Sequence, residues 1–361
     1  MRIVQLANLY SPVSGGLRTA VDMLGTGYAA AGHQRALVVP GRDYTRHRRE
    51  NGMVITVPGP SVAPGYRLVL DPRPVLRVLS GLRPDVIEVS DKATLTVAAR
   101  WARRRGVRTV LFSHERLDAI LSPHTPKWFP LEATADRVNR HLSQAFDAIV
   151  VTSAFAAAEF ARIGARSLHR VPLGVDLDTF RPLPAPECSA VRLVHLGRLS
   201  TEKRPDLALA TVAALKKRGT DVHLDLVGDG PLGPKLRAWA RRERLPVHFH
   251  GHVGDRSKVA RLLAHADVAL ATCPIESFGL AVLEALACGT PVVAADRGAA
   301  HELLTPGAGL GVAPTGPSFA DGVERVLSLP PDHRRATART RAEGYPWKTT
   351  INGMLDVLTP Q

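Results

Sequence analysis

Short runs of β-branched and other apolar residues alternate along the whole chain with longer segments in which apolar positions recur every three or four residues. The first pattern is typical of strands that are buried on both faces, and the second of amphipathic helices. Strands that alternate with helices form parallel sheets covered by helices on both sides. The pattern therefore predicts an α/β protein.

The apolar runs fall into two series separated by a proline-rich segment, residues 169–190. Helical patterns that separate the strands include residues 16–32 and residues 95–106, the latter ending at a glycine. We predict strands in the first series at residues 2–7, 35–40, 54–59, 85–90, 108–114 and 148–153, and in the second series at residues 191–199, 222–230, 247–253, 268–274, 291–296 and 309–314.

The length of 361 residues is that of two domains, because a domain usually has about 100 to 200 residues. We predict two doubly wound domains, 1–180 and 181–340, with a cleft between them where the carboxyl ends of the strands face each other. Residues 341–361 form a further amphipathic helix with no domain of their own to close.

No run of 18 or more apolar residues occurs, and the first residues lack the pattern of a secretory signal peptide. We therefore expect a cytoplasmic protein without a transmembrane helix. The three cysteines, Cys188, Cys273 and Cys288, are not at metal-ligand spacing. An odd number of cysteines in such a chain predicts reduced thiols that pack, and neither a disulfide nor a metal site.

The net charge of +14 is concentrated in the first half, where residues 1–181 hold 25 Lys and Arg against 15 Asp and Glu. Such an excess suits a nucleic acid, an anionic membrane surface or a phosphorylated acceptor, and it also suits the arginine-rich usage of a high-GC genome. The basic runs at residues 45–50 and 101–108 are not interleaved with aromatic residues as in single-strand binders. We do not expect a nucleic-acid partner.

Gly15 and Gly16 lie between the first strand and the helix that follows it. Backbone N–H groups at a helix N-terminus bind anions, and glycine lets a phosphate approach closely, although tight strand-to-helix turns also need glycine. The surrounding sequence is not the G-x-G-x-x-G pattern of dinucleotide binding. A nicotinamide or flavin enzyme is therefore disfavoured.

Arg198 and Lys203 bracket a turn directly after the first strand of the second series. Two cations beside a helix start are suited to neutralising a diphosphate leaving group, although exposed basic residues in a loop are often only solvated. Gly228 belongs to the next strand-ending turn, "LVGDGP", for which we favour a structural role.

Glu276 and Glu284 lie eight positions apart in the otherwise apolar stretch "CPIESFGLAVLEALACGTPVVAAD". We predict a strand, a loop and then a helix here, with Phe278, Gly279 and Leu280 presenting N–H groups at the helix N-terminus. A carboxylate is costly to bury without a partner, but it accepts well from adjacent sugar hydroxyls. The pair is suited to binding hydroxyl groups.

These motifs, with "GRLSTEKRPD", "VGDGP", "VPLGVDLDTF" and "SPVSGGLRTAV", resemble the retaining glycosyltransferases of family 4, which have the GT-B fold. The resemblance spans most of the chain, and the order of the motifs matches. It implies two doubly wound Rossmann-like domains that face a central cleft, with the C-terminal helix crossing back to the first domain. It also implies a nucleotide diphosphate sugar as donor substrate, with no cofactor and no metal.

The resemblance implies a role for each candidate site residue. Glu276 contacts the hydroxyls of the donor sugar, and Glu284 contacts the ribose. Arg198 and Lys203 hold the diphosphate, and Gly16 approaches the distal phosphate. The remaining donor-binding candidates are backbone positions in the same motifs, namely Gly15, Gly197, Gly228, Phe278, Gly279 and Leu280.

His114 follows a strand of the first domain, where the family has a histidine that contacts the donor sugar. Its surroundings, with the first strand and helix, resemble actinobacterial mannosyltransferases. Asp176 and Asp178 form a D-x-D, but they lie in the interdomain segment and not at the end of a nucleotide-binding strand. A metal-independent enzyme with cationic side chains on the diphosphate fits this better.

We therefore expect a retaining, metal-independent hexosyltransferase whose acceptor hydroxyl enters from the first domain. Domain closure would exclude water, and front-face substitution is implied because no nucleophile is evident. The acceptor stays open between a lipid-linked or anionic molecule, with peripheral contact at the inner face of a membrane, and a small metabolite. GDP-mannose is the first expectation for the donor, and UDP-glucose or UDP-N-acetylglucosamine are alternatives. An inactive sugar-nucleotide-binding protein is the alternative from another class.

Overall fold

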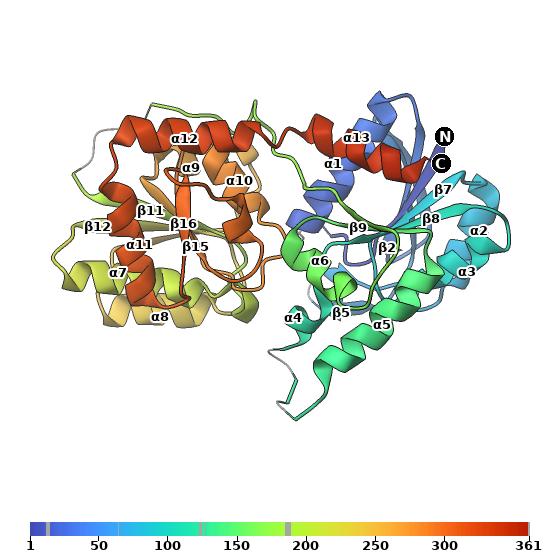
Figure 1. Ribbon diagram of the computed structural model, residues 1–361, viewed down its shortest axis with the longest axis horizontal. Helices are drawn as coiled ribbons and strands as arrows, with labels where there is room; N and C mark the ends of the chain where they lie inside the picture. The colour runs from blue at the N-terminus through green and yellow to red at the C-terminus, as the bar shows by residue number, and fades with distance from the viewer. Residues whose placement is uncertain (12–14, 64, 123–124, 127, 185–188, 360–361) are drawn as a thin grey trace. The chain divides into compact units, whose positions relative to one another are not determined.

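The chain is described by a computed structural model, which covers residues 1–11, 15–63, 65–122, 125–126, 128–184 and 189–359. Cys188, which sequence analysis assigned to packing, lies outside the described residues. Contacts divide the chain into two compact units, each built around its own parallel sheet. Unit 1 consists of Met1–Leu173 with Trp347–Gln361, and unit 2 of Gly174–Pro346 (Figure 1).

Most of unit 1 alternates strands and helices as predicted, but residues 34–67 form five consecutive strands. Its elements are β1 (Arg2–Leu6), α1 (Gly16–Ala30), β2 (Gln34–Gly41), β3 (Thr45–Arg49), β4 (Gly52–Pro58), β5 (Ser61–Ala63), β6 (Tyr66–Arg67), α2 (Arg73–Leu82), β7 (Val86–Val89), the 3-10 helix η1 (Thr94–Thr96), α3 (Val97–Arg103), β8 (Arg108–Ser113), α4 (Leu117–Leu121), α5 (Leu131–Ala145), β9 (Ala148–Val151), α6 (Ala154–Ala161), β10 (Leu168–Arg170) and α13 (Trp347–Leu358).

The main sheet of unit 1 has the order β10-β9-β8-β7-β1-β2-β4-β3. All neighbours are parallel except β3, which pairs antiparallel with β4. The basic run at residues 45–50, which sequence analysis treated as a charged segment, is this outermost strand. Exposed charges at an open edge are consistent with protection against pairing with other chains.

The core of unit 1 lies on both faces of this sheet. Side chains alternate between the faces along each strand, so Ala36 and Val38 of β2 pack with α2, α3, α5 and α6, and Leu37 and Val39 pack with α1. Because β9 is buried on both faces, it appears in the sequence as a continuous apolar run, whereas the buried Glu88 interrupts the run of β7.

Unit 2 has a single described sheet of six parallel strands with the order β13-β12-β11-β14-β15-β16. Its elements are β11 (Val191–Leu196), the 3-10 helix η3 (Thr201–Lys203), α7 (Pro205–Lys217), β12 (Val222–Val227), α8 (Gly233–Arg242), β13 (Val247–Gly251), α9 (Arg256–His265), β14 (Val268–Ala271), α10 (Leu280–Ala287), β15 (Val292–Ala295), the 3-10 helix η4 (Ala300–Leu303), β16 (Gly309–Val312), α11 (Gly316–Leu327) and α12 (Pro331–Glu343).

The boundary between the units lies at Leu173–Gly174, whereas sequence analysis set the domain limit at 180/181. The segment in between belongs to unit 2 because Phe180 is fully buried there and Val175 bridges to Pro346. Sequence alone could not assign it, since proline-rich composition marks a linker but not the residues that the linker packs against.

Helix α13 belongs to unit 1, although unit 2 precedes it in the chain. Ile351 fills the space above Gly27 of α1, where a Cβ would lie only 2.3 Å from its side chain. The Thr350 hydroxyl donates to the Pro172 carbonyl at 2.9 Å. Within the described residues, none of the helices combines enough length and apolarity to cross a bilayer.

Candidate functional site

The strand order of unit 2 reverses its direction between β11 and β14. Numbered from β11, the order is 3-2-1-4-5-6, the arrangement of a Rossmann fold, with consecutive elements running outward in opposite directions from β11 and β14. In such sheets ligands bind outside the carboxyl ends of the strands at this switch point. The loops after β11 and β14 carry Arg198, Lys203 and Glu276.

Lys203 and Glu276 meet at this switch point. Lys203 Nζ donates to Glu276 Oε2 at 2.8 Å, although the two residues are 73 positions apart. The loop after β14 is fastened to η3, because the Thr272 hydroxyl donates to the Lys203 carbonyl at 2.8 Å and the Cys273 thiol to the Glu202 carbonyl at 3.2 Å. The backbone therefore holds the two charged side chains in register.

The Lys203–Glu276 pair is partly open to solvent, with 33% and 26% of the two side chains exposed. Burial disfavours the charged ammonium, but the Glu276 carboxylate and other acidic groups outweigh it, so the pKa of Lys203 is raised above its ordinary value. Lys203 therefore stays positively charged throughout the physiological range. A fixed charge of this kind is suited to an anionic ligand.

Gly298, in the loop after β15, packs against the backbone of Glu276. The sequence did not predict this role. The Ala299 N–H donates to the Glu276 carbonyl at 2.6 Å, and Gly298 has a φ of +78°. A Cβ at Gly298 would lie 2.8 Å from the backbone nitrogen of Glu276. Only glycine allows this close approach. The motif "DRGAA" was the available signal, since an isolated glycine in a polar turn indicates a special backbone position.

Glu284 is buried in α10, with 10% of its side chain exposed, and it has a cationic partner that the sequence did not reveal. Arg256, the first residue of α9, donates from Nη2 to Glu284 Oε1 at 3.0 Å. The guanidinium also lies 4.7 Å from the centre of the Phe180 ring. Burial raises the pKa of the Glu284 carboxyl, and Arg256 opposes that rise.

The loop before α10 has the predicted form. Helix α10 begins at Leu280, and Gly279 precedes it in the left-handed region with a φ of +104°. Phe278 is buried next to this turn. The N-terminus of α10 therefore lies at the carboxyl end of β14, where the first N–H groups of a helix attract negative charge.

The turns after β11 and β12 pack against each other through glycine. Gly228 has a φ of +136°, and a Cβ there would lie 1.9 Å from the Gly197 carbonyl oxygen. This contact accounts for Gly228 without a ligand, and it supports the turn that carries the exposed Arg198. The donor-binding roles of Gly197 and Gly228 stay predictions.

His114 lies at the corresponding edge of unit 1, directly after β8. Its Nε2 is 3.1 Å from the hydroxyl oxygen of Ser90, which follows the neighbouring strand β7. Burial lowers the pKa of His114 to about 3, so the imidazole is neutral at physiological pH. In unit 1 His114 is therefore suited to hydrogen bonding and not to carrying charge.

The loop that carries His114 is tied to α6 and to the loop after β7. Glu159 of α6 is fully buried, accepts from the Leu117 N–H at 2.9 Å and forms an ion pair with Lys92. Burial lowers the pKa of Lys92, and Glu159 opposes this. These contacts join segments that are far apart in the sequence, so no local pattern predicts them.

Gly16 is the first residue of α1, and Gly15 directly precedes it; both are exposed. Residues 12–14 of the same motif lie outside the described residues. Gly15 has a negative φ, and the structure describes no atom within 4 Å of a Cβ at this position. The described residues therefore give no packing reason for glycine here, and the donor-binding roles of Gly15 and Gly16 stay predictions.

The side chain of Asp176 binds the backbone of its own turn. Asp176 Oδ1 accepts from the backbone N–H groups of Asp178 at 3.2 Å and Thr179 at 3.0 Å. Partial burial raises the pKa of Asp176, but the hydrogen bonds from Thr179 and Asp178 reverse this, and the pKa is lowered. This is a turn that an aspartate stabilises. Within the described residues no group of three or more His, Cys, Asp or Glu side chains is placed to hold a metal ion.

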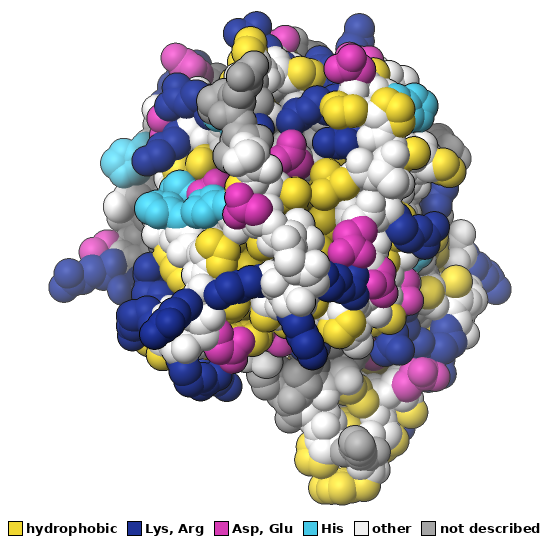
Figure 2. Space-filling model, turned by 90° about the vertical axis from the view of Figure 1, so that its left-hand side faces the viewer, with side chains coloured by type: hydrophobic (Ala, Val, Ile, Leu, Met, Phe, Trp, Pro, Cys, Tyr) yellow, Lys and Arg dark blue, Asp and Glu magenta, His cyan; other side chains and the backbone are white. Residues whose placement is uncertain are grey.

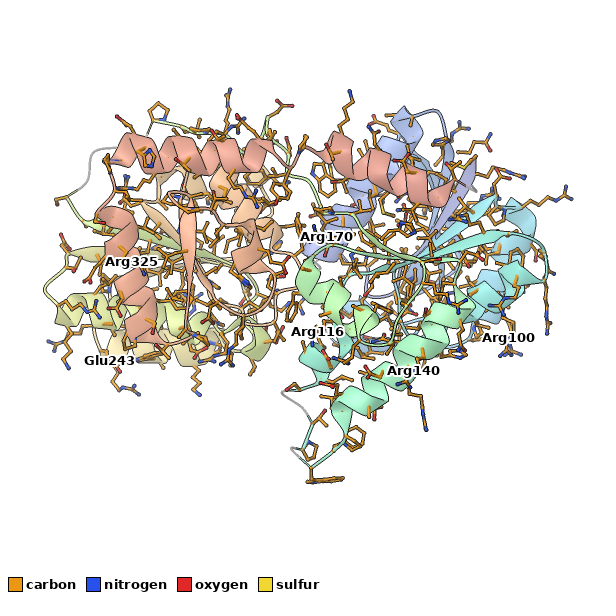
Figure 3. All side chains as sticks on the ribbon, in the orientation of Figure 1. Arg100, Arg116, Arg140, Arg170, Glu243 and Arg325 are labelled. Atoms are coloured by element: carbon orange, nitrogen blue, oxygen red, sulfur yellow. The ribbon has the colours of Figure 1, made fainter. Side chains whose placement is uncertain are left out.

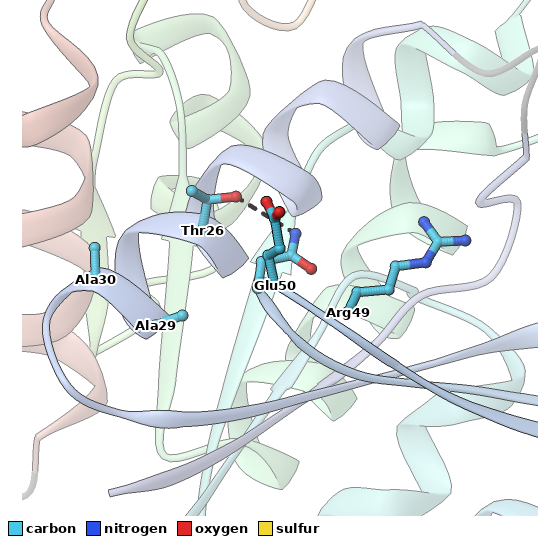
Figure 4. A pocket seen from close by; sticks show the side chains of 6 residues that line it. Thr26, Ala29, Ala30, Arg49 and Glu50 are labelled. Atoms are coloured by element: carbon cyan, nitrogen blue, oxygen red, sulfur yellow. Dashed lines mark hydrogen bonds between the residues drawn. The ribbon is translucent and has the colours of Figure 1, made fainter.

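A hollow in unit 1 lies apart from these residues. It is bounded by Thr26, Ala29 and Ala30 of α1 and by Arg49, Glu50 and Asn51 at the turn between β3 and β4 (Figure 4). Thr26 is ten residues beyond Gly16, or about 15 Å along the helix. The hollow therefore belongs to the opposite end of α1 from the glycine turn.

Comparisons with known proteins agree with the fold and identify the family. The model of the family described as "Glycosyltransferase Family 4" matches residues 14–179, and that described as "Glycosyl transferases group 1" matches residues 190–328. The chain belongs to the family 4 glycosyltransferases. The predictions of a family 4 enzyme and of the GT-B class are confirmed.

The relatives sharpen this assignment. The chain is 45% identical to the GDP-mannose-dependent alpha-(1-6)-phosphatidylinositol dimannoside mannosyltransferase of Mycobacterium tuberculosis, over 99% of this chain and 96% of the relative. It is 29% identical to a GDP-mannose-dependent alpha-(1-6)-phosphatidylinositol monomannoside mannosyltransferase of the same species, over 80% of each. The predicted resemblance to actinobacterial mannosyltransferases is thereby confirmed.

A solved structure shows the same fold at low identity. Sucrose-phosphate synthase from Thermosynechococcus elongatus superposes with a TM-score of 0.81 at 21% identity, covering 99% of this chain and 98% of that one. At this identity the match supports the two-unit α/β fold and not the substrate.

Proposed function

We propose that this glycosyltransferase moves mannose from GDP-mannose to a hydroxyl of a phosphatidylinositol mannoside, with retention of configuration and without a metal ion. The observation that carries the proposal is the 45% identity, over nearly the full length of both chains, to a mannosyltransferase named for this donor and this type of acceptor. The Lys203–Glu276 pair at the switch point of unit 2 supports a nucleotide-sugar site.

Arg198 and Lys203 hold the diphosphate in this proposal. Both follow β11 at the carboxyl edge of the sheet, and the raised pKa of Lys203 keeps its charge available. When the bond between sugar and phosphate breaks, negative charge develops on the leaving GDP. Preorganised cations and the α10 N-terminus stabilise that charge, which provides an alternative to a metal ion.

Glu276 and Glu284 hold hydroxyl groups. Glu276 exchanges part of its contact with Lys203 for the sugar hydroxyls as the diphosphate takes up the lysine charge. Glu284 accepts from the ribose, while Arg256 orients its buried carboxyl and opposes the rise in its pKa that burial causes. Arg256 is thus a positioning residue for the ribose contact.

The transfer follows front-face substitution. The sugar acquires oxocarbenium character, the acceptor oxygen attacks from the side on which the phosphate departs, and the leaving phosphate takes the acceptor proton. Glu276 orients the sugar and does not form a covalent bond. His114 remains neutral and offers its ring nitrogen to a hydroxyl.

A lipid-linked acceptor also accounts for the basic first half of the chain. The headgroup phosphate of the acceptor and the anionic lipids around it attract Lys and Arg. We therefore propose peripheral association with the inner face of the cytoplasmic membrane.

The experiment that tests the donor is thermal stabilisation of the purified protein by a panel of GDP- and UDP-sugars in the presence of EDTA. A ligand that binds only the native state raises the melting temperature by mass action. We expect a clear shift with GDP-mannose and GDP, and a much smaller one with UDP-glucose or UDP-N-acetylglucosamine. A shift with UDP-sugars alone, or one that requires added divalent metal, would contradict the proposal.

The acceptor is tested with purified phosphatidylinositol mannosides, myo-inositol phosphate and inositol as competing acceptors for GDP-mannose. We expect transfer to the lipid, with the new linkage in the α configuration of the donor by NMR. Transfer only to the soluble inositol compounds would assign the enzyme to small-metabolite acceptors. Donor binding without transfer to any acceptor would favour a binding protein.

A further inference from the structure

An exposed group of apolar side chains projects from unit 1 between α4 and α5. Trp128 is 82% exposed, and Phe129 and Leu121 are also classed as exposed. We call these three residues the aromatic tip. Apolar side chains gather at the lower end of the molecule in Figure 2, where the α4–α5 segment lies in Figure 1.

The aromatic tip has no evident role in the stability of unit 1. Trp128 and Phe129 touch each other edge to face, with ring centroids 6.3 Å apart, but neither belongs to the cores of the unit. A tryptophan that stays exposed does not gain the favourable free energy of removing its large apolar surface from water. Such a side chain is better explained by a surface that buries it outside the unit.

The two charges on α5 that have no described ion-pair partner are both arginines, which favours an anionic surface. Helix α5 follows the aromatic tip directly, and its acidic residues Glu132 and Asp136 both face Arg162, at 3.8 Å and 2.6 Å. Arg137 and Arg140 of the same helix are exposed, and no ion pair joins them to a described residue. Figure 3 shows Arg140 extending outward from α5.

The basic surface continues beyond α5. Arg103 of α3 donates to the carbonyls of Gln144 and Ala145 at the end of α5, so the basic end of α3 adjoins it. Tryptophan beside arginine is the composition of segments that lie at a bilayer interface. The ring enters the headgroup region, and the guanidinium groups bind lipid phosphates.

We propose that the aromatic tip inserts into the interface of an anionic lipid bilayer, with Arg137 and Arg140 of α5 contacting lipid phosphates. The proposal rests on the proposed function, because an enzyme with a bilayer-embedded acceptor has to dock on the surface that holds it. It assigns the docking to one segment and not to the basic charge of the whole first half.

The test is flotation of the full-length protein with vesicles of phosphatidylcholine alone and of phosphatidylcholine with phosphatidylinositol. We expect binding to the anionic vesicles only. Trp128→Ala with Phe129→Ala should weaken binding at least tenfold, and Arg137→Gln with Arg140→Gln should weaken it by about five-fold for each charge removed. The arginine effect should disappear at high salt.

Matched controls come from elsewhere in unit 1. Tyr44 is also an exposed aromatic, and Arg46 and Arg48 are exposed arginines on the edge strand β3. Tyr44→Ala removes an exposed aromatic side chain, and Arg46→Gln with Arg48→Gln removes the same number of charges, without touching the aromatic tip. They should leave vesicle binding close to that of the unaltered protein.

Three results would overturn the assignment. The first is unchanged vesicle binding by the Trp128 and Phe129 variant, and the second is an equal loss of binding in the control variants. The third is a smaller oligomer of the Trp128 and Phe129 variant by light scattering without vesicles, which would make the aromatic tip a protein contact. GDP-mannose stabilisation without vesicles separates the two proposals. If GDP-mannose does not stabilise the protein, only the donor assignment is contradicted. If GDP-mannose stabilises it normally but the Trp128 and Phe129 variant binds vesicles as well as the unaltered protein, only the role of the aromatic tip is contradicted.

Discussion

The two units place charged side chains inside similar sheets in opposite ways. Unit 1 buries Glu88 and Arg35 completely beneath α1, whereas unit 2 keeps Lys203 and Glu276 at the carboxyl edge of its sheet and partly open to solvent. A ligand cannot reach the buried Glu88 and Arg35, whereas it could replace the contact between Lys203 and Glu276. Charged residues in a doubly wound sheet are therefore functional candidates only where they reach its carboxyl edge.

The buried network of unit 1 is a chain of hydrogen bonds across three strands and a helix. Glu88 accepts from the Tyr28 hydroxyl at 2.6 Å and from the Gln5 amide at 2.9 Å, and Gln5 accepts from Arg35 Nε at 2.8 Å. Burial raises the pKa of both Glu88 and Tyr28. The network thus joins β1, β2 and β7 to α1 and has a structural role.

The largest effect is expected from Lys203→Ala in unit 2. Removing this cation from the proposed diphosphate site should lower kcat by about 10²–10³-fold, the usual result of deleting one group that stabilises a developing anion. The melting temperature should change little, because the Lys203–Glu276 pair is partly exposed. Steady-state kinetics with GDP-mannose and a thermal melt measure both, and a nearly normal kcat would remove Lys203 from the site.

Glu88→Ala in unit 1 should show the reverse profile. It leaves the buried Tyr28 hydroxyl and Gln5 amide without their acceptor, which costs about 1–3 kcal/mol for each unpaired group. Urea denaturation should report the loss, while the GDP-mannose affinity of the folded fraction stays normal. Glu88→Gln keeps the shape and should lose less. Full stability in the alanine variant would show that the network is dispensable.

Gly298→Ala should reduce kcat by about tenfold, because the added Cβ pushes against the backbone nitrogen of Glu276 and moves its carboxylate. Gly219 offers a matched control. It lies in the same unit, has a φ of +84° and has no described atom within 4 Å of a Cβ. Gly219→Ala therefore introduces similar backbone strain without moving Glu276. Equal losses in the two variants would mean that strain and not displacement is responsible.

The last prediction concerns pH. His114 has a native pKa of about 3, below its ordinary value of 6.5, so the unfolded chain binds a proton in that interval that the native state does not. Stability should therefore fall as the pH decreases through this window, and His114→Asn should flatten the fall. Urea denaturation at about pH 5 and about pH 8 measures it. An equal fall in stability between about pH 8 and about pH 5 in the unaltered protein and in His114→Asn would show that His114 is accessible to protons.

Much of the fold was predictable because its evidence is local. A central parallel strand is buried on both faces, so "AIVV" and "VVAA" stand out as apolar runs in the sequence. The antiparallel edge strand Thr45–Arg49 was not predicted because it is held by pairing with β4, while its own residues are charged and exposed.

The candidate site divides in the same way. Glu276 and Glu284 are eight positions apart on one loop and helix, so their spacing and context were visible in the sequence. Arg256 was missed because it reaches Glu284 only through the packing of α9 beside α10. Gly298 was missed because only the packing of its turn against the loop after β14 brings it to the backbone of Glu276.

The sequence by itself determined the alternation of strands and helices and the existence of two parallel sheets. These follow from period, composition and spacing along the chain. The tertiary structure alone decided that β14 lies beside β11, and hence that Lys203 meets Glu276 across 73 residues. It also decided which charges are sealed beneath α1. Strand order depends on long-range packing, and no local pattern encodes which strands become neighbours.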